Sequence, residues 1–237
     1  MNPDYPEPHS PAATRRSILI GTCALAITGC SPAGDGGGKA ATPENPSPSL
    51  PATGNEKIVT MLGDSITAGF GLAASDALPA QLEKALRAKG LSARVRAAGV
   101  SGDTTAGGLA RLDFSVQNDT DLCIVALGAN DMLQGTQPET VKSNLQAIID
   151  RLKARRIPVL LVGMKAPPQY GTYAAEFEKV FTHLAKENNV ATYPFLLAGV
   201  ALADRYNQAD GIHPNAEGVK IMVAGLVPVV EKALTGS

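Results

Sequence analysis

The sequence contains no tryptophan, and aromatic residues make up only 4% of its 237 residues. Side chains on which nucleic-acid bases or sugar rings could stack are therefore scarce. The formal net charge is −1, and acidic and basic residues are interspersed along the chain. Because the chain has neither a basic face nor an acidic tail, we expect no nucleic-acid partner.

Cysteine is also scarce, with three copies: Cys23, Cys30 and Cys123. The first two lie in the N-terminal segment, where we expect one to be removed with a signal peptide and the other to carry lipid. No disulfide can then form within the mature domain. Cys123 lies in an apolar, strand-like run, and we expect it to be a small buried apolar residue.

The first 30 residues have the pattern of an export signal. Arg15 and Arg16 precede an apolar stretch, residues 18–28, that is too short for a membrane-spanning helix. The stretch ends in Ile27-Thr28-Gly29-Cys30, which resembles a bacterial lipobox. The resemblance implies cleavage before Cys30 and acylation of its thiol and new amine. The arginine pair also resembles a twin-arginine signal. An ordinary signal peptide with an incidental cysteine is the alternative.

Residues 31–56 are rich in proline, glycine, alanine and serine and hold almost no large apolar side chains. Such a segment cannot offset the entropy lost on ordering, so a flexible tether is predicted. Residues 57–237 then form one domain, which is long enough to bury a sizeable core. We expect an exported protein of the bacterial periplasm or cell envelope, anchored to a membrane by lipid on Cys30.

From Lys57 onward, strand-like and helix-like patterns alternate. Apolar runs predict strands at 58–62, 93–98, 122–127, 158–164 and 190–193. Helical spacing of apolar residues predicts helices at 76–89, 104–116, 138–154, 173–188 and 215–234. Strict alternation predicts a parallel sheet covered on both faces. The predicted fold class is α/β, a three-layer α/β/α, flavodoxin-like fold with a five-stranded parallel sheet.

Polar segments follow the first four predicted strands. They are Gly63-Asp64-Ser65, Val100-Ser101-Gly102-Asp103, Gly128-Ala129-Asn130-Asp131 and residues 165–171. Ligands of parallel sheets bind beyond the carboxyl ends of the strands. These four loops are therefore expected to converge on one functional rim.

Ser65 is the candidate nucleophile at this rim. Gly63 lets the chain turn sharply off the strand, and the next residues can begin a helix whose amide end faces negative charge. A plain turn is the alternative, because glycine, aspartate and serine all favour turns. Residues 63–67 lack the second glycine of the G-x-S-x-G elbow, which argues against an α/β-hydrolase.

His213 is the candidate base. His9 precedes the signal and is lost with it, and His183 lies in a predicted helix, where a surface histidine is expected. Asp210 lies three residues before His213 and can fold back to hold the imidazole, because a serine hydroxyl needs an oriented base to become a nucleophile. A helix-entry turn with an incidental histidine is the alternative.

Three groups could stabilise an oxyanion: the backbone N–H of Ser65, the backbone N–H of Gly102 and the side-chain amide of Asn130. A turn glycine and a loop-capping asparagine are the alternatives for the last two. The sequence patterns alone leave these alternatives open.

Four blocks, taken in order, resemble the SGNH hydrolases, the GDSL esterase/lipase family. They are Gly63-Asp64-Ser65-Ile66, residues 100–104, Gly128-Ala129-Asn130-Asp131 and Asp210-x-x-His213-Pro214. Residues 101–105, 108–112 and 211–215 resemble the periplasmic acyl-thioesterase/lysophospholipase/arylesterase branch. The resemblance implies that Ser65 is the nucleophile, His213 the base and Asp210 its orienting acid. It also implies that Gly102 and Asn130 are oxyanion donors.

We therefore expect a monomeric serine esterase that hydrolyses carboxylic ester or thioester bonds of small acyl-ester or lipid substrates. It would act through an acyl-enzyme on Ser65 and need no metal or other cofactor. Six apolar residues on rim loops are candidates for an acyl pocket, with ordinary loop packing as the alternative for each: Leu72, Met132, Leu133, Pro168, Tyr170 and Ile212.

Three other functions remain open at this point. SGNH-like domains also remove acetyl groups from carbohydrates, and a noncatalytic envelope protein could bind lipid or glycan on an inactive scaffold. Asp64, Asp103 and Asp131 crowd the rim as well, which could indicate a divalent-metal phosphoesterase.

Overall fold

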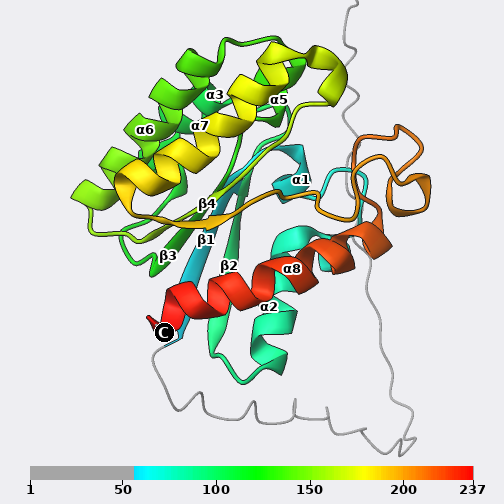
Figure 1. Ribbon diagram of the computed structural model, residues 1–237. Coiled ribbons are helices and arrows are strands. Elements are labelled where there is room, and N and C mark those ends of the chain that lie inside the picture. The colour runs from blue at the N-terminus through cyan, green and yellow to red at the C-terminus, as the bar shows by residue number, and fades with distance from the viewer. Residues whose placement is uncertain (1–55, 237) are drawn as a thin grey trace, which may run out of the picture. The chain divides into compact units, whose positions relative to one another are not determined.

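The computed structural model describes residues 56–236 (Figure 1). The predicted signal with Cys30 lies outside the described residues, as does all but the last residue of the predicted tether. Within the described part, the predicted five-stranded parallel sheet is confirmed. Its strands are β1 Lys57–Gly63, β2 Ala93–Gly99, β3 Leu122–Ala126, β4 Val159–Val162 and β5 Ala191–Tyr193.

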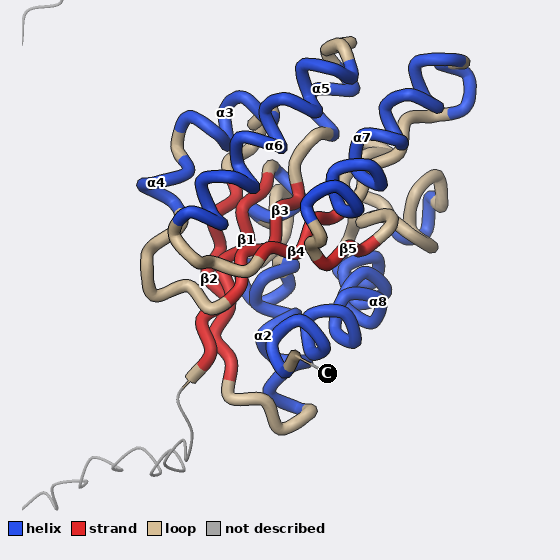
Figure 2. Tube along the Cα trace, turned by 60° about the vertical axis from the view of Figure 1, so that its left-hand side comes forward, coloured by secondary structure: helices blue, strands red, loops and turns tan. Residues whose placement is uncertain are grey.

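The strands lie in the order β2-β1-β3-β4-β5, and each neighbouring pair is parallel (Figure 2). This is the order of flavodoxin-like sheets. The chain places β2 on one side of β1 and β3 on the other, so the direction of winding reverses between β2 and β3. Ligands of such sheets bind at this reversal, just beyond the carboxyl ends of the strands.

Helices cover both faces of the sheet, which confirms the three-layer arrangement (Figure 1). Helices α2 Leu78–Ala88 and α8 Ala216–Thr235 pack together on one face, and α3 Thr105–Ala110, α6 Pro138–Ala154 and α7 Thr172–Asn188 cover the other. Shorter helices lie in the connections: α1 Ser65–Ala68, α4 Leu112–Ser115, α5 Ala129–Leu133, η1 Ala74–Asp76, η2 Pro168–Tyr170 and η3 Asp204–Tyr206. Across residues 56–236, no helix has the length and apolar character to cross a membrane.

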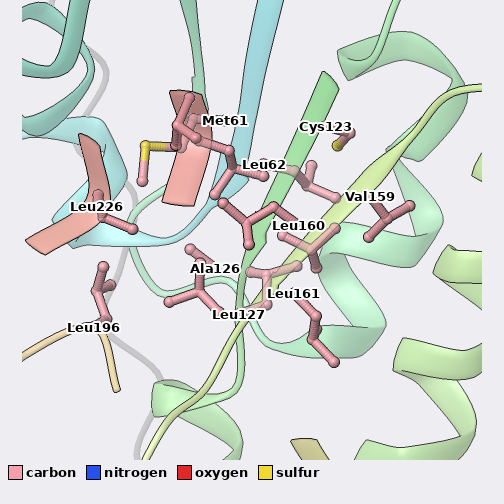
Figure 3. Packing of buried hydrophobic residues seen from close by; sticks show 14 of the residues in the cluster. Met61, Leu62, Cys123, Ala126, Leu127, Val159, Leu160, Leu161, Leu196 and Leu226 are labelled. Carbon is pink, nitrogen blue, oxygen red and sulfur yellow. The ribbon is translucent and has the colours of Figure 1, made fainter. Parts of the chain in front are cut away.

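The core surrounds the three central strands, β1, β3 and β4 (Figure 3). Strands β3 and β4 are buried along their whole length, as expected for parallel strands covered on both faces. Side chains of β1 such as Leu62 pack with those of β3 and β4. Cys123 is buried among them, and desolvation raises the pKa of its thiol to about 12. Its predicted role as a small buried residue is confirmed.

The predicted helix over residues 104–116 is wrong in one respect, because it is two short helices that meet at Arg111. The backbone of Arg111 (φ −101°, ψ 6°) leaves the helical conformation between α3 and α4. Its side chain turns to bind carbonyl oxygens at the ends of β1 and β2. Gly107 and Gly108 also weaken the helix. Apolar spacing could not reveal this break, because the partners of Arg111 come from distant segments.

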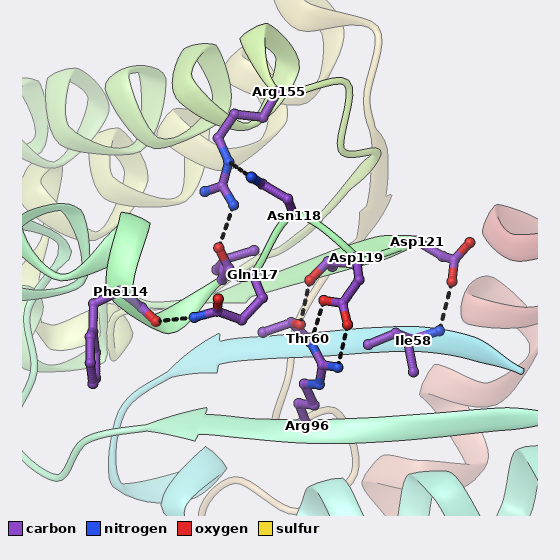
Figure 4. A network of polar contacts seen from close by, with 11 residues as sticks. Ile58, Thr60, Arg96, Phe114, Gln117, Asn118, Asp119, Asp121 and Arg155 are labelled. Atoms are coloured by element: carbon purple, nitrogen blue, oxygen red, sulfur yellow. Dashed lines mark hydrogen bonds and ion pairs between the residues drawn. The ribbon is translucent and has the colours of Figure 1, made fainter.

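Polar contacts join the segment between α4 and β3 to strands β1 and β2 (Figure 4). The hydroxyl groups of Thr60 and Thr120 lie 2.8 Å apart, and the Asp121 carboxylate accepts a hydrogen bond from the Ile58 N–H. Arg155 donates to Asn118 Oδ1 at 3.0 Å. These contacts hold the loop before β3 against the sheet.

Candidate active site

Ser65 lies directly beyond β1, at the reversal of the sheet. It is the first residue of α1, and Asp64 caps that helix by accepting the Ile66 N–H at 3.0 Å. A side chain on Gly63 would put its Cβ 2.1 Å from Thr67 Oγ1, so only glycine fits between the strand and the helix. This tight turn lifts Ser65 to the rim.

His213 reaches the same rim from the loop that precedes α8. Its carbonyl oxygen accepts the Gln208 N–H at 2.8 Å, which holds the loop in a closed turn. Asn215 then begins α8, since its side chain accepts the N–H groups of Glu217 and Gly218, both at 3.0 Å. The histidine is therefore positioned by fixed backbone on both sides.

The structure brings Ser65, His213 and Asp210 together. His213 Nε2 lies 2.9 Å from Ser65 Oγ, and His213 Nδ1 lies 2.7 Å from Asp210 Oδ2. An ionised carboxylate only accepts hydrogen bonds, so Nδ1 carries the proton and the neutral ring leaves Nε2 free to accept one from the serine. This is the arrangement in which an imidazole can act as a base toward a hydroxyl group.

Asp210 is held ionised by its own loop. Its carboxylate accepts the backbone N–H of His213 at 3.0 Å and that of Ile212 at 2.9 Å. These bonds, together with the bond to the His213 ring, lower the pKa of Asp210 to about 2. The carboxylate is therefore available to stabilise a positive charge on the imidazole.

The three predicted oxyanion donors lie just beyond the ends of β1, β2 and β3. Ser65 begins α1, and the first N–H groups of a helix have no partner within it. Gly102 has φ +85°, and a Cβ built there would meet nothing within 4 Å, so its backbone is open to a ligand. The Asn130 amide donates to the Asp103 carbonyl oxygen at 2.9 Å and keeps a second N–H for a ligand.

The three rim aspartates have separate partners. Asp131 is buried and accepts the Thr105 N–H at 2.7 Å and the Thr105 hydroxyl at 2.6 Å. Asp103 binds Arg111 at 2.5 Å, and Asp64 caps α1. Across the part of the chain that the structure describes, no three side chains of histidine, cysteine, aspartate or glutamate are grouped to hold a metal ion. This arrangement does not favour the metal-phosphoesterase alternative.

Asp64 is the rim aspartate with a buried, unpaired carboxyl oxygen. Its side chain is buried, and Oδ2 has no hydrogen-bond partner among the described residues. Desolvation outweighs the bond from the Ile66 N–H and the nearby His213 ring, and it raises the pKa of Asp64 to about 6. The residue beside the candidate nucleophile therefore titrates in an unusual range for a carboxyl group.

The six predicted acyl-pocket residues do not form one pocket. Met132, Leu133 and Tyr170 line a cavity of about 300 Å³, together with Gly135 and Tyr173. The other three lie elsewhere. Leu72 lines a small hollow beside Ser65 and His213, Pro168 is exposed in η2, and Ile212 is half-exposed next to His213.

Phe70 contacts the site, although it is not among the site residues predicted from the sequence. Its ring centroid lies 4.6 Å from that of His213, and half of the residue is exposed. Gln208 Nε2 donates to the Phe70 carbonyl oxygen at 2.8 Å and joins the two loops. An aromatic residue between Gly69 and Gly71, in a chain with few aromatics, was the available signal.

The sequence pattern of the GDSL-like Lipase/Acylhydrolase family matches residues 61–221, which include every residue of this arrangement. The chain belongs to this family. The predicted resemblance to the SGNH/GDSL hydrolases is thereby confirmed.

Individual relatives agree with the family. The chain is 37% identical to Esterase TesA of Pseudomonas aeruginosa over 176 residues, which cover 73% of this chain and 88% of that protein. It is 38% identical to Thioesterase 1/protease 1/lysophospholipase L1 of Escherichia coli over 159 residues, covering 66% and 75%.

Solved structures of the family also match. The crystal structure of TesA is similar with a TM-score of 0.72 and 36% identity, covering 75% of this chain and all of that one. The structure of AlinE4, an SGNH-hydrolase family esterase, matches with a TM-score of 0.65 and 42% identity, covering 77% and 99%. This GDSL-family chain is thus an ester-hydrolysing enzyme, as predicted, and the similarities favour neither a carbohydrate deacetylase nor a noncatalytic binding protein.

Proposed function

We propose that this enzyme is a serine esterase in which Ser65 is the nucleophile, His213 the base and Asp210 the acid that orients the base. The observation that carries the proposal is the chain of two contacts, 2.9 Å from Ser65 Oγ to the imidazole and 2.7 Å from the imidazole to the carboxylate. Residues from opposite ends of the domain make these contacts, and each group has the atom needed for the next step.

In the first step, Ser65 Oγ attacks the carbonyl carbon of an ester or thioester while His213 Nε2 takes its proton. The carbonyl oxygen becomes an oxyanion, which the N–H groups of Ser65 and Gly102 and the amide of Asn130 stabilise. His213 then gives the proton to the leaving alcohol or thiol. The product is an acyl-enzyme on Ser65.

In the second step, a water molecule replaces the alcohol. His213 Nε2 takes a proton from the water as the water oxygen attacks the acyl carbon, and the proton then returns to Ser65 Oγ. The carboxylic acid leaves. Every proton in both steps has a donor and an acceptor among these side chains and water, so we propose that no cofactor takes part.

For the substrate, we propose an ester or thioester with an apolar acyl chain. The cavity lined by Met132, Leu133 and Tyr170, about 300 Å³ in volume, is at the small end of the range for ligand sites and has apolar and aromatic walls. Similar proteins carry the names arylesterase, thioesterase and lysophospholipase. The cavity supports a medium acyl chain better than an acetyl group.

For the location, we propose export and attachment to a membrane through lipid on Cys30, with residues 31–56 as a tether and a monomeric enzyme domain. The signal pattern supports this. Strand β1 begins at Lys57, where the tether would join the domain, and ends at Gly63, two residues before Ser65. Cys30→Ala should move the activity from the membrane fraction to the soluble fraction.

Three variants test the catalytic assignment. Ser65→Ala should abolish labelling by a fluorophosphonate probe and lower kcat for a p-nitrophenyl ester by about 10⁴-fold or more. His213→Ala should do the same to kcat. His183→Ala, which removes an exposed histidine of α7, is the control and should leave kcat unchanged. Persistent labelling without Ser65, or equal losses in the two histidine variants, would contradict the assignment.

A further inference from the structure

Arg111 binds three acceptors on two segments of the rim with one side chain. Its Nη2 donates to the Gly63 carbonyl oxygen and its Nη1 to the Ala98 carbonyl oxygen, both at 2.9 Å. Its Nε donates to the Asp103 carboxylate at 2.5 Å. The side chain is only 19% exposed, and Nη1 also donates to the Ser115 hydroxyl at 2.9 Å, so this is a largely buried cation with four hydrogen bonds rather than a surface ion pair.

Each of these rim acceptors belongs to a segment that supplies one proposed oxyanion donor. Gly63 ends β1, two residues before Ser65, and Ala98 lies near the end of β2, just before the turn that carries Gly102. Asp103 follows Gly102 directly, and its carbonyl oxygen accepts the Asn130 amide. One guanidinium therefore links the donor segments after β1 and β2 directly, and the donor after β3 through Asp103.

Backbone hydrogen bonds also hold the turn that carries Gly102. The Val100 N–H donates to the Gly63 carbonyl oxygen at 3.1 Å, and the Asp103 N–H closes the turn on Val100 at 3.1 Å. The Gly63 oxygen thus receives both the backbone of the turn and Arg111 Nη2. A Cβ built on Gly102 would have no neighbour within 4 Å among the described residues, so no packing holds this residue. The position of the turn therefore depends on the hydrogen bonds just described.

We propose that Arg111, together with Asp103, is a positioning residue that fixes the oxyanion donors of Ser65, Gly102 and Asn130 relative to one another. The inference rests on the proposed function. Donors must lie about 2.7–3.1 Å from the developing oxyanion, and a displacement of about 1 Å can cost about 100-fold in rate. The planar guanidinium suits this role because its donors have fixed directions, whereas a lysine ammonium is a single point charge.

Arg155 provides a matched control. Its side chain is 20% exposed, and it binds the Val116 carbonyl oxygen and Asn118 Oδ1 (Figure 4). It also pairs with Asp113 at 3.5 Å. Its burial and kinds of partner are similar to those of Arg111, but its partners lie on α4 and in the segment before β3, and none of them belongs to a segment that supplies an oxyanion donor. Loss of Arg155 should weaken the fold without moving the oxyanion donors.

The experiment compares Arg111→Met, Arg111→Lys and Arg155→Met in the full domain. For a p-nitrophenyl ester, Arg111→Met should lower kcat by about 100-fold and change KM by less than about threefold. A trifluoromethyl ketone, which forms an oxyanion on the serine, should bind more weakly by a similar factor. Arg111→Lys should recover only part of both losses. Arg155→Met should lower the melting temperature and leave kcat and inhibitor affinity unchanged.

If Arg111→Met does not fold, the same link can be tested from the other side. Asp103→Asn keeps the shape of the side chain that Arg111 binds but removes its charge. It should lower kcat and trifluoromethyl ketone affinity together by about tenfold, at unchanged KM. Unchanged kcat and inhibitor affinity in Asp103→Asn and Arg111→Lys would overturn the inference while leaving Ser65 labelling intact. A wild-type enzyme that neither hydrolyses esters nor reacts with a fluorophosphonate would instead overturn the proposed function.

Discussion

Asp210 holds His213 with both of its carboxylate oxygens. Oδ2 lies 2.7 Å from the ring Nδ1, and Oδ1 accepts the backbone N–H of the same histidine at 3.0 Å. Ring and backbone are therefore tied to one carboxylate within a turn of four residues. The contact to Ser65 depends on this tie, because it sets the direction of Nε2.

Asp210→Asn tests the role of this carboxylate. The amide keeps the shape but can donate to Nδ1, which favours the wrong tautomer of the His213 ring. We expect kcat to fall by roughly 10⁴-fold with little change in the fold. Steady-state kinetics and the rate of fluorophosphonate labelling measure this. A variant that keeps more than a tenth of the wild-type kcat would show that the tautomer is set by something else.

The low pKa of Asp210 predicts its behaviour in acid. With a pKa of about 2, below the ordinary 3.8, the carboxylate stabilises the fold above pH 4, and this contribution is lost as the pH falls toward 2. Loss of activity between pH 4 and pH 7 must then come from other groups. Urea titrations of the wild type and Asp210→Asn at pH 2.5 and pH 5 should differ most at pH 5.

Asp64 predicts the opposite trend at higher pH. Because its pKa is raised from 3.8 to about 6, the folded protein binds more protons than the unfolded chain between these values, so the free energy of unfolding falls as the pH rises from 4 to 6. The stability lost in this way is at most about 3 kcal/mol.

Asp64→Asn should remove this trend. The amide oxygen can still cap the Ile66 N–H, and no charge is left to bury. Urea unfolding at pH 4.5 and pH 7.5 checks the prediction, with the wild type as reference. The same loss of stability between the two pH values in both proteins would show that the Asp64 carboxyl is not its source.

Asn130→Ala tests the oxyanion site. Removal of one such donor typically costs about 10²- to 10³-fold in kcat, and KM should change little because the bond forms mainly in the transition state. The variant also loses the bond to the Asp103 carbonyl oxygen, so its melting temperature should be measured as well. A rise in KM at constant kcat would instead assign Asn130 to ground-state binding.

The cavity beside α5 predicts a preference for acyl length. In the wild type, kcat/KM for p-nitrophenyl esters should rise from acetate to medium chains, since each buried CH₂ contributes about 0.8 kcal/mol. Leu133→Ala should lower kcat/KM for the preferred chain length by about tenfold, which flattens the profile. Leu202, which is also an exposed leucine but is not part of the cavity, gives the control Leu202→Ala. A flat wild-type profile would exclude the cavity as the acyl site.

The separation of the rim aspartates predicts indifference to chelators. Asp131 is bound to Thr105 and Asp103 to Arg111, so neither is free to share an ion with Asp64. Treatment with EDTA should leave ester hydrolysis unchanged. Inactivation that added Mg²⁺, Mn²⁺ or Zn²⁺ reverses would restore the metal-dependent alternative.

The local sequence pattern was enough to predict the five strands and the main helices, and it placed the first three motif blocks after strands. Runs such as residues 122–126 are apolar at every position because both faces of the sheet are covered, and that pattern survives in the sequence alone. The identity of Ser65, Asp210 and His213 as candidates followed from residue chemistry, position after a strand and the spacing of the last two.

Tertiary structure decided what depends on contacts between distant segments. The break at Arg111 exists because its partners, Gly63 and Ala98, lie 48 and 13 residues away, and no local period records them. The burial of Asp64 and the packing of Phe70 on His213 are likewise properties of loops that meet only in the folded chain. The sequence determines which chemical group each side chain carries. The burial of these groups, their pKa values and their positions relative to one another arise only when the sheet brings its loops together.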